Sequence, residues 1–237
     1  MRLTGITEIK GKIILQSGLH IGAGDMEMHI GGVDNPVIRH PHTLEPYIPG
    51  SSLKGKVRSL LEMESGLMVK TGGNPACYKT LQGLAEPEKE KCSKILKLFG
   101  SSGADAQEVA GLGPTRVSFA DCPLDDDWKT SALENRLSFT EVKSENSINR
   151  IKGVAENPRF TERVVSGAQF KFSVTLKQLD QDDHLLDYLL LGLKLLELDA
   201  LGGSGSRGYG RVAFEFADPE LQKRFDNIKP FAGGSGA

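Results

Sequence analysis

Apolar and polar residues alternate without a break over residues 169–176, where phenylalanine, valine and leucine occupy every second position. A period of two places these side chains on one face of a β-strand, so this stretch is the clearest strand in the sequence. Weaker alternation predicts three further strands, at residues 9–15, 115–119 and 212–216.

Apolar residues that recur every three or four positions predict two helices. The first covers residues 51–64, with Ser51 as the expected N-cap. The second covers residues 184–200, capped by Asp182 or Asp183, and carries leucine at nine positions. A helix that is apolar on nearly all sides is expected to be buried on more than one of them.

In chain order these elements run strand, helix, strand, strand, helix, strand. This order predicts an α+β fold of the ferredoxin-like (RRM-like) βαββαβ type, with a four-stranded antiparallel sheet and two helices on one face. We expect a single domain over residues 1–232 and a flexible tail at 233–237. The core is expected at residues 6–15, 51–64, 115–121 and 168–217.

Polar, irregular stretches between these elements predict three insertions. Long loops inside a compact domain are usually functional or disordered. The insertions are an irregular loop at residues 16–50, a helical lid at 66–113 with a short helix near 88–99, and a segment at 122–167 in which 137–142 and 161–165 are candidate arms of a protruding hairpin.

The composition narrows the possible functions only slightly. The 29 lysines and arginines against 31 acidic residues give a net charge of −2, so a nucleic-acid binder of this composition needs a local basic groove. The three cysteines are odd in number and widely spaced, which argues against a disulfide framework. No apolar run reaches the ~20 residues that a membrane span needs, and no secretory segment follows Met1. We therefore expect a soluble cytoplasmic protein with no membrane partner.

Residues 201–211 contain five glycines and two arginines between the second helix and the last strand. Glycine allows backbone N–H groups to approach an anion closely, and arginine adds charge-assisted hydrogen bonds. This glycine loop therefore suits phosphate binding, with a flexible turn as the alternative. A strand follows it and no Gly-Lys-Ser/Thr is present, so it is not a Walker loop.

Several motifs in a fixed order resemble the RAMP superfamily, and more narrowly the repeated backbone subunit of type III-A CRISPR (Csm) effector complexes. The resemblance covers residues 6–216; residues 72–92 and the tail depart from it. The motifs lie at residues 18–22, 30–39, 48–56, 98–100 and 140–150, together with the glycine loop.

This resemblance implies a prokaryotic protein that polymerises in further copies along a guide RNA (crRNA), displays it for pairing with a target RNA, and cleaves the target at regular intervals. Other subunits of the effector complex would be its partners. A protruding hairpin, the thumb, would wedge into the guide–target duplex, here at residues 140–165.

The resemblance also implies that Asp34, in Val33-Asp34-Asn35-Pro36, is the cleaving residue. On local sequence alone this motif is a turn. A carboxylate there suits a site for Mg²⁺ (or Mn²⁺) that RNA phosphates complete, or it assists attack by the neighbouring 2′-OH.

We assign RNA binding to residues of three kinds: motif residues that the resemblance links to the guide or target, basic and hydroxyl residues near the first helix and in the glycine loop, and thumb residues that reach bases or phosphates. A solvated surface is the alternative for the charges on the first helix. The candidates are His20, Arg39, Ser51, Ser52, Lys54, Lys56, Arg58, Asn146, Asn149, Arg150, Arg159, Gly203, Gly205, Arg207 and Arg211.

Four histidines within 23 residues also suggest a zinc site, but their spacing matches no metal signature, and structural Zn²⁺ is possible without being favoured. Three other functions remain open. They are a metal-independent guide-processing ribonuclease that uses a histidine, a non-catalytic architectural RNA-binding subunit, and a binder of small phosphorylated molecules.

Overall fold

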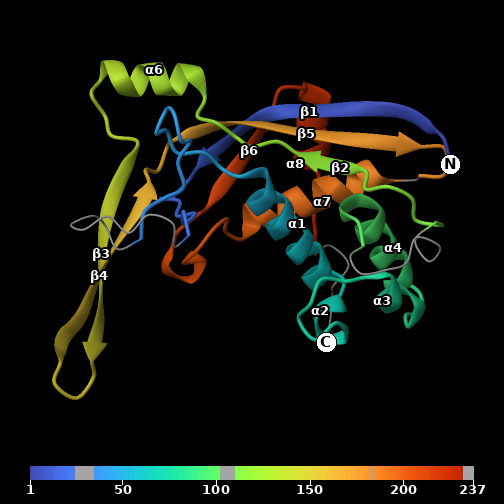
Figure 1. Ribbon diagram of the computed structural model, residues 1–237, viewed down its shortest axis with the longest axis horizontal. Helices are drawn as coiled ribbons and strands as arrows, with labels where there is room; N and C mark the ends of the chain where they lie inside the picture. The colour runs from blue at the N-terminus through green and yellow to red at the C-terminus, as the bar shows by residue number, and fades with distance from the viewer. Residues whose placement is uncertain (25–34, 102–109, 183, 232–237) are drawn as a thin grey trace.

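A computed structural model describes residues 1–24, 35–101, 110–182 and 184–231 of the chain. Its central sheet has the strand order β2-β5-β1-β6 (Figure 1). The strands are β1 (Leu3–Leu15), β2 (Val117–Phe119), β5 (Gln169–Leu179) and β6 (Val212–Phe216). All neighbours are antiparallel, so the ferredoxin-like prediction is confirmed.

The core lies between this sheet and two helices, α1 (Gly50–Glu64) and α7 (Leu185–Leu198), which cover one face of it (Figure 1). Ile13 pairs with Phe170 on one side and Phe214 on the other, and all three are buried. The two helices approach closely at Gly192, where a Cβ atom would lie 2.7 Å from Val57 Cγ1.

The predicted Ser51 cap of α1 is wrong, and Asp182 does not cap α7; Asp183, the other cap predicted for that helix, lies outside the described residues. Helix α1 begins one residue before Ser51, after Pro49, and its Gly50 N–H donates to Asp121 Oδ1 at 2.7 Å. Helix α7 follows His184, which lies in the left-handed region, and no side chain of the described residues forms a hydrogen bond that caps it. Asp182 instead accepts hydrogen bonds from Arg116.

The lid contains more helix than the sequence indicates. The predicted helix near 88–99 is confirmed as α4 (Glu88–Phe99). Two shorter helices precede it, α2 (Leu67–Lys70) and α3 (Tyr78–Gln82).

The thumb is a two-stranded arm that projects from the body (Figure 1). The hairpin prediction is confirmed, but its arms are β3 (Thr140–Asn149) and β4 (Val154–Val164) rather than 137–142 and 161–165. Besides α2 and α3, two further helices were not predicted: α6 (Asp126–Glu134), which precedes the thumb, and α8 (Pro219–Asp226), after the last strand. Within the described residues, no helix is both long and apolar enough to cross a membrane.

Candidate nucleic-acid interface

The glycine loop, Leu201 to Arg211, is fixed against the segment that follows β1. The N–H of Gly203 donates to His20 O, and that of Gly210 donates to Gly18 O, both at 2.9 Å. A Cβ atom on Gly202 would lie 2.4 Å from His20 O, and one on Gly210 would lie 1.9 Å from Leu201 O. Glycine is required at both positions, so the loop has a defined shape and is not a flexible turn.

His20 joins the glycine loop to the thumb. Its Nδ1 lies 2.7 Å from the carbonyl oxygen of Glu162 on β4, and its ring carbon Cδ2 lies 3.6 Å from the Cβ position of Gly203. A carbonyl oxygen only accepts, so Nδ1 carries the proton. The Nε2 atom of the neutral ring is then an acceptor.

The second turn of α1 contacts the end of α7, two residues before the glycine loop begins, because Lys56 Nζ lies 2.7 Å from Asp199 Oδ2. The Ser52 N–H donates to Pro49 O, whereas no described residue accepts from the Ser51 N–H. The predicted anion site at this helix end is therefore smaller than expected. Lys54 is half-buried and has no ion-pair partner among the described residues.

Two predicted RNA-binding arginines are held by carboxylates of the thumb. Arg39 forms an ion pair with Glu162, whose other oxygen accepts from the Val37 N–H at 2.9 Å. Arg207 Nη1 lies 2.5 Å from Glu145 Oε2. Burial alone would raise the pKa of Glu145, but the neighbouring Tyr209, Arg207 and Lys143 side chains outweigh it and lower the pKa below its usual value.

The RNA-binding candidates on the thumb differ in whether their side chains already bond to other protein groups. Arg150 and Arg159 are exposed and have no ion-pair partner in the part of the chain that the structure describes. Asn146 is exposed at a break in the strand register. Asn149 instead shapes the turn, where its Oδ1 accepts from the N–H groups of Ile151 and Lys152.

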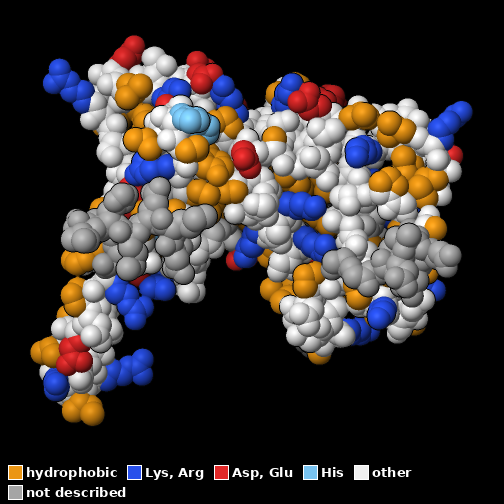
Figure 2. Space-filling view, in the orientation of Figure 1, with side chains coloured by type: hydrophobic (Ala, Val, Ile, Leu, Met, Phe, Trp, Pro, Cys, Tyr) orange, Lys and Arg blue, Asp and Glu red, His pale blue; other side chains and the backbone are white. Residues whose placement is uncertain are grey.

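Basic side chains gather on the thumb and over α1, on either side of a hollow between the thumb and the helical layer (Figure 2). Arg211 belongs to the same region, since its backbone pairs with Gln16 and Ser17 at the end of β1. No described residue forms an ion pair with its side chain. The glycine loop, the base of the thumb and the first turns of α1 border this hollow, which is here called the basic hollow.

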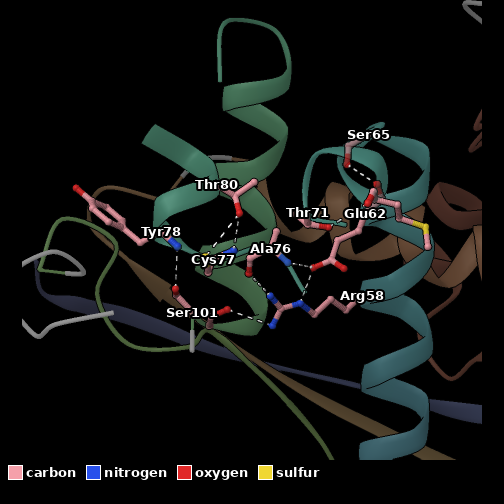
Figure 3. Close-up of polar contacts among 11 residues, drawn as sticks. Arg58, Glu62, Ser65, Thr71, Ala76, Cys77, Tyr78, Thr80 and Ser101 are labelled. Atoms are coloured by element: carbon pink, nitrogen blue, oxygen red, sulfur yellow. Dashed lines mark hydrogen bonds and ion pairs between the residues drawn. The ribbon is translucent and has the colours of Figure 1, made fainter. Parts of the chain in front are cut away.

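Arg58 does not belong to the basic hollow, contrary to the sequence prediction. Its side chain leaves α1 toward the lid (Figure 3). There it donates to Glu62 Oε1 at 2.8 Å, to Ala76 O at 2.6 Å and to Gly100 O at 3.2 Å. With its guanidinium committed to these protein groups, Arg58 fastens the lid to α1.

Asp34 lies outside the described residues, as do the other residues from 25 to 33. The chain is described again at Asn35, whose carbonyl accepts from the Glu162 N–H at 3.1 Å. Gly22 and Val37 form an antiparallel bridge, so both ends of the intervening segment are attached at the base of the thumb.

Three residues of this region were not identified from the sequence: Glu145, Glu162 and Tyr209. Tyr209 is the one aromatic residue among positions 201–211, and that position was the available signal. The two glutamates give no such signal, because the thumb strands are rich in charges of both signs.

The cysteines and histidines do not gather into a metal centre within the described residues. Cys92 and Cys122 are buried, and burial raises the pKa of their thiols to about 11 and about 12. The rings of His40 and His42 lie 5.7 Å apart, and His29 is outside the described residues.

Residues 12–213 match the RAMP superfamily. The chain is 42% identical to "CRISPR system Cms endoribonuclease Csm3" of Methanothermobacter thermautotrophicus, covering 87% of this chain and 82% of that protein. It is 41% identical to the protein of the same name from Streptococcus thermophilus, covering 88% and 86%.

Solved structures are similar over comparable lengths. One is a crystal structure of a Csm3–Csm4 subcomplex of the type III-A CRISPR-Cas interference complex, with 28% identity, a TM-score of 0.54 and coverage of 97% and 99%. Another is Methanopyrus kandleri Csm3, with 27% identity, a TM-score of 0.58 and coverage of 91% and 77%. The chain therefore belongs to the RAMP superfamily and, within it, to the family of the CRISPR endoribonuclease Csm3.

Proposed function

We propose that this chain is a backbone subunit of a type III CRISPR effector complex, which binds the guide RNA and cleaves the target RNA paired with it. The endoribonuclease name of its relatives and the type III-A complex in which a similar chain was crystallised support this function. Further copies of itself, other subunits of the complex and the two RNAs are the proposed partners.

The observation that carries the proposal is the convergence of groups in the basic hollow. The glycine loop, His20 and the first turns of α1 come from distant parts of the sequence, yet they are joined by the contacts of His20 to Gly203 and of Lys56 to Asp199. Backbone N–H groups, lysines and arginines in one hollow suit the phosphates of a single RNA strand.

We assign the guide strand to the glycine loop and the start of α1, with Lys54 and Arg211 as phosphate contacts. Arg39 and Arg207 contribute once a phosphate competes with their thumb carboxylates. The unprotonated Nε2 of His20 suits a ribose 2′-OH, which is a hydrogen-bond donor. Arg150, Arg159 and Asn146 are assigned to the duplex that the thumb reaches.

We assign cleavage to Asp34, which precedes Asn35 in the sequence; Asn35 itself is bridged to Thr161 at the base of the thumb. A divalent cation held there by the carboxylate and by RNA phosphates would polarise the scissile phosphate. A single carboxylate is a weak metal site, so we expect cleavage to be assembled only on the bound target and to depend on Mg²⁺ or Mn²⁺.

The test is the purified complex with its guide and a matched target RNA, with and without Mg²⁺. We expect Asp34→Ala to slow cleavage by about a hundredfold or more while guide and target binding are unchanged. Asp226→Ala, on the exposed surface of α8, is the matched control and is expected to cleave at the wild-type rate.

Cleavage that survives both EDTA and Asp34→Ala would identify a metal-independent ribonuclease and would overturn the assignment to Asp34. Regular protection of RNA without any cleavage by the wild type would identify an architectural subunit. Loss of RNA binding in Asp34→Ala would also contradict a catalytic role for this residue.

A further inference from the structure

Tyr209 belongs to the glycine loop, but its ring is held by the thumb. The ring centre lies 4.5 Å from Lys143 Nζ and 4.9 Å from the guanidinium carbon of Arg163. Lys143 belongs to β3 and Arg163 to β4, so each strand of the thumb supplies one cation to the same ring. The side chain is 0% exposed, although the four loop residues before it are all exposed.

Alternating charges hold these two cations in place. Arg163 Nε donates to Glu141 Oε1 at 2.8 Å, and Lys143 Nζ lies 3.4 Å from Glu145 Oε1. Burial, together with the neighbouring Glu145 carboxylate, raises the pKa of Tyr209, so the phenol keeps its proton at neutral pH. The neutral ring therefore remains attractive to both cations.

The two strands of the thumb are connected to the body in different ways, β4 through its backbone and β3 through side chains. Backbone bridges join β4 to the body at Leu19–Val164 and Asn35–Thr161. Among the described residues β3 has no such backbone bridge, and its side chains attach it to the body through Thr140, Lys143 and Glu145. Because β3 is paired with β4 along its length, loss of the Tyr209 ring would leave the hairpin attached through β4 and would remove the contact that both strands make with the glycine loop.

Because the thumb is long, a small change of its angle at the base displaces its tip by several ångströms. With eleven residues at ~3.3 Å each, β4 extends ~35 Å, so a tilt of ~5° would move its tip by ~3 Å. A tilt would therefore misplace the RNA duplex that the outer part of the thumb reaches, and a misplacement of ~1 Å near a reacting group can cost about a hundredfold in rate. The angle of the thumb is therefore a quantity that the chain must control.

We propose that Tyr209 is a positioning residue that sets the angle of the thumb against the glycine loop, so that the loop that binds the guide also aims the arm at the paired target. This inference rests on the proposed function and deepens it. The ring, rather than the hydroxyl, carries the role, because both cations contact its face.

The experiment uses the complete effector complex with guide and matched target, and measures single-turnover cleavage over a range of target concentrations. We expect Tyr209→Leu to lower the cleavage rate at saturating target by about tenfold or more, with guide binding and half-saturating target concentration within twofold of wild type. We expect Tyr209→Phe, which keeps the ring, to restore at least half of the wild-type rate.

Tyr188→Leu is the matched control. Tyr188 is also buried and also has a lysine, Lys94, over its ring, but it lies on α7 against the lid helix α4. We expect both leucine variants to lower the melting temperature, and only Tyr209→Leu to lower the cleavage rate of the folded complex.

Wild-type rates in Tyr209→Leu, or equal rate losses in both leucine variants, would overturn the proposal. So would failure of Tyr209→Phe to recover the rate. These outcomes differ from failure of the proposed function, in which the wild-type complex itself does not cleave or the Asp34→Ala variant still does.

Discussion

At the scale of single residues, the partners of a cation decide whether it can bind a phosphate. Lys54 and Arg58 lie one turn apart on α1 and look equivalent in sequence. In the fold, Arg58 bonds to one carboxylate and two carbonyl groups, whereas Lys54 has no ion-pair partner among the described residues. Arg58 therefore attaches the lid, whereas Lys54 stays available for the phosphate contact that we propose for it.

This difference predicts opposite results for two matched substitutions. Lys54→Met is expected to weaken guide binding and to reduce the slope of log affinity against log salt by about 0.7, with stability nearly unchanged. Arg58→Met is expected to leave that slope unchanged and to destabilise the protein by about 2–3 kcal/mol, because the buried Glu62 carboxylate loses its charged partner. Guide titrations at several salt concentrations, together with denaturant unfolding, measure both. A reduced slope in Arg58→Met would show that the lid contact is not its main role.

The paired arginines lead to a second prediction at this scale. Glu145 forms an ion pair with Arg207, so a guide phosphate that binds Arg207 must compete with that carboxylate. We expect Glu145→Gln to tighten guide binding by severalfold at low salt, since the competing charge is removed. Filter binding against wild type measures the change, and Glu156→Gln, farther out on β4, is the control. Weaker guide binding in Glu145→Gln would mean that the ion pair supports the RNA site rather than opposing it.

At the scale of elements, one contact between distant segments joins the edge of the sheet to the start of α7. The buried side chain of Arg116, just before β2, donates two hydrogen bonds of 2.9 Å to Asp182, between β5 and α7. Burial alone would raise the pKa of Asp182, but the bonds from Arg116 and from the Leu179 N–H lower it below its ordinary value. A carboxyl group with a lowered pKa stabilises the fold above its unfolded pKa of about 3.9, and that stability is lost as the pH falls through the folded pKa.

Substitution of Arg116 should therefore change stability in a pH-dependent way. At neutral pH, Arg116→Met is expected to cost about 3–5 kcal/mol, because it leaves the Asp182 charge buried without its main partner. Without Arg116, burial raises the pKa of Asp182, so the deficit should narrow as the pH falls toward 4. Denaturant unfolding between pH 4 and pH 7 measures this, with Lys171→Met, which removes an exposed ion pair, as a control with little effect. A deficit that stays constant with pH would contradict this account.

The elements that were predicted well from the sequence are those in which buried residues recur at the regular spacing of a strand or a helix. The β5 strand and helices α1, α4 and α7 have buried residues at regular spacing, and their boundaries were close to those observed. The thumb strands are mostly exposed on both faces, so no apolar alternation marks where they begin. Helix α8 buries only Phe225, too little to give a pattern.

The candidate site was predictable where one motif carries the function, and not where a contact joins distant segments. The glycine loop was found from its composition. The Arg58 contacts reach Ala76 and Gly100, and the cap of α1 comes from Asp121, so neither is visible in the local sequence. RNA binding by the individual candidates, and Asp34 with its metal, remain predictions.

At the scale of the whole molecule, the net charge is small, but the positive side chains are unevenly distributed over the surface. The net charge is −2, yet basic side chains gather around one hollow between the thumb and the helical layer (Figure 2). A chain that associates head to tail along an RNA uses two different surfaces and so forms an open filament. The length of the guide would then limit the number of copies.

This arrangement predicts that complex mass rises in steps with guide length. On guides lengthened a few nucleotides at a time, native mass spectrometry should show whole-chain increments at a constant nucleotide interval. Target cleavage should add one cut at each increment. Lys54→Met is expected to raise the concentration required for assembly without changing the interval, because it weakens phosphate contacts but not the subunit spacing. A mass that does not depend on guide length would contradict filament formation.

The bridge between Gly22 and Val37 has a practical consequence for engineering. Paired backbones fix the two boundaries of the intervening stretch about 5 Å apart, independently of how many residues it contains. The stretch can therefore be exchanged for that of a relative, joined at these two positions, and the exchange would show whether the cleavage that we assign to Asp34 moves with it.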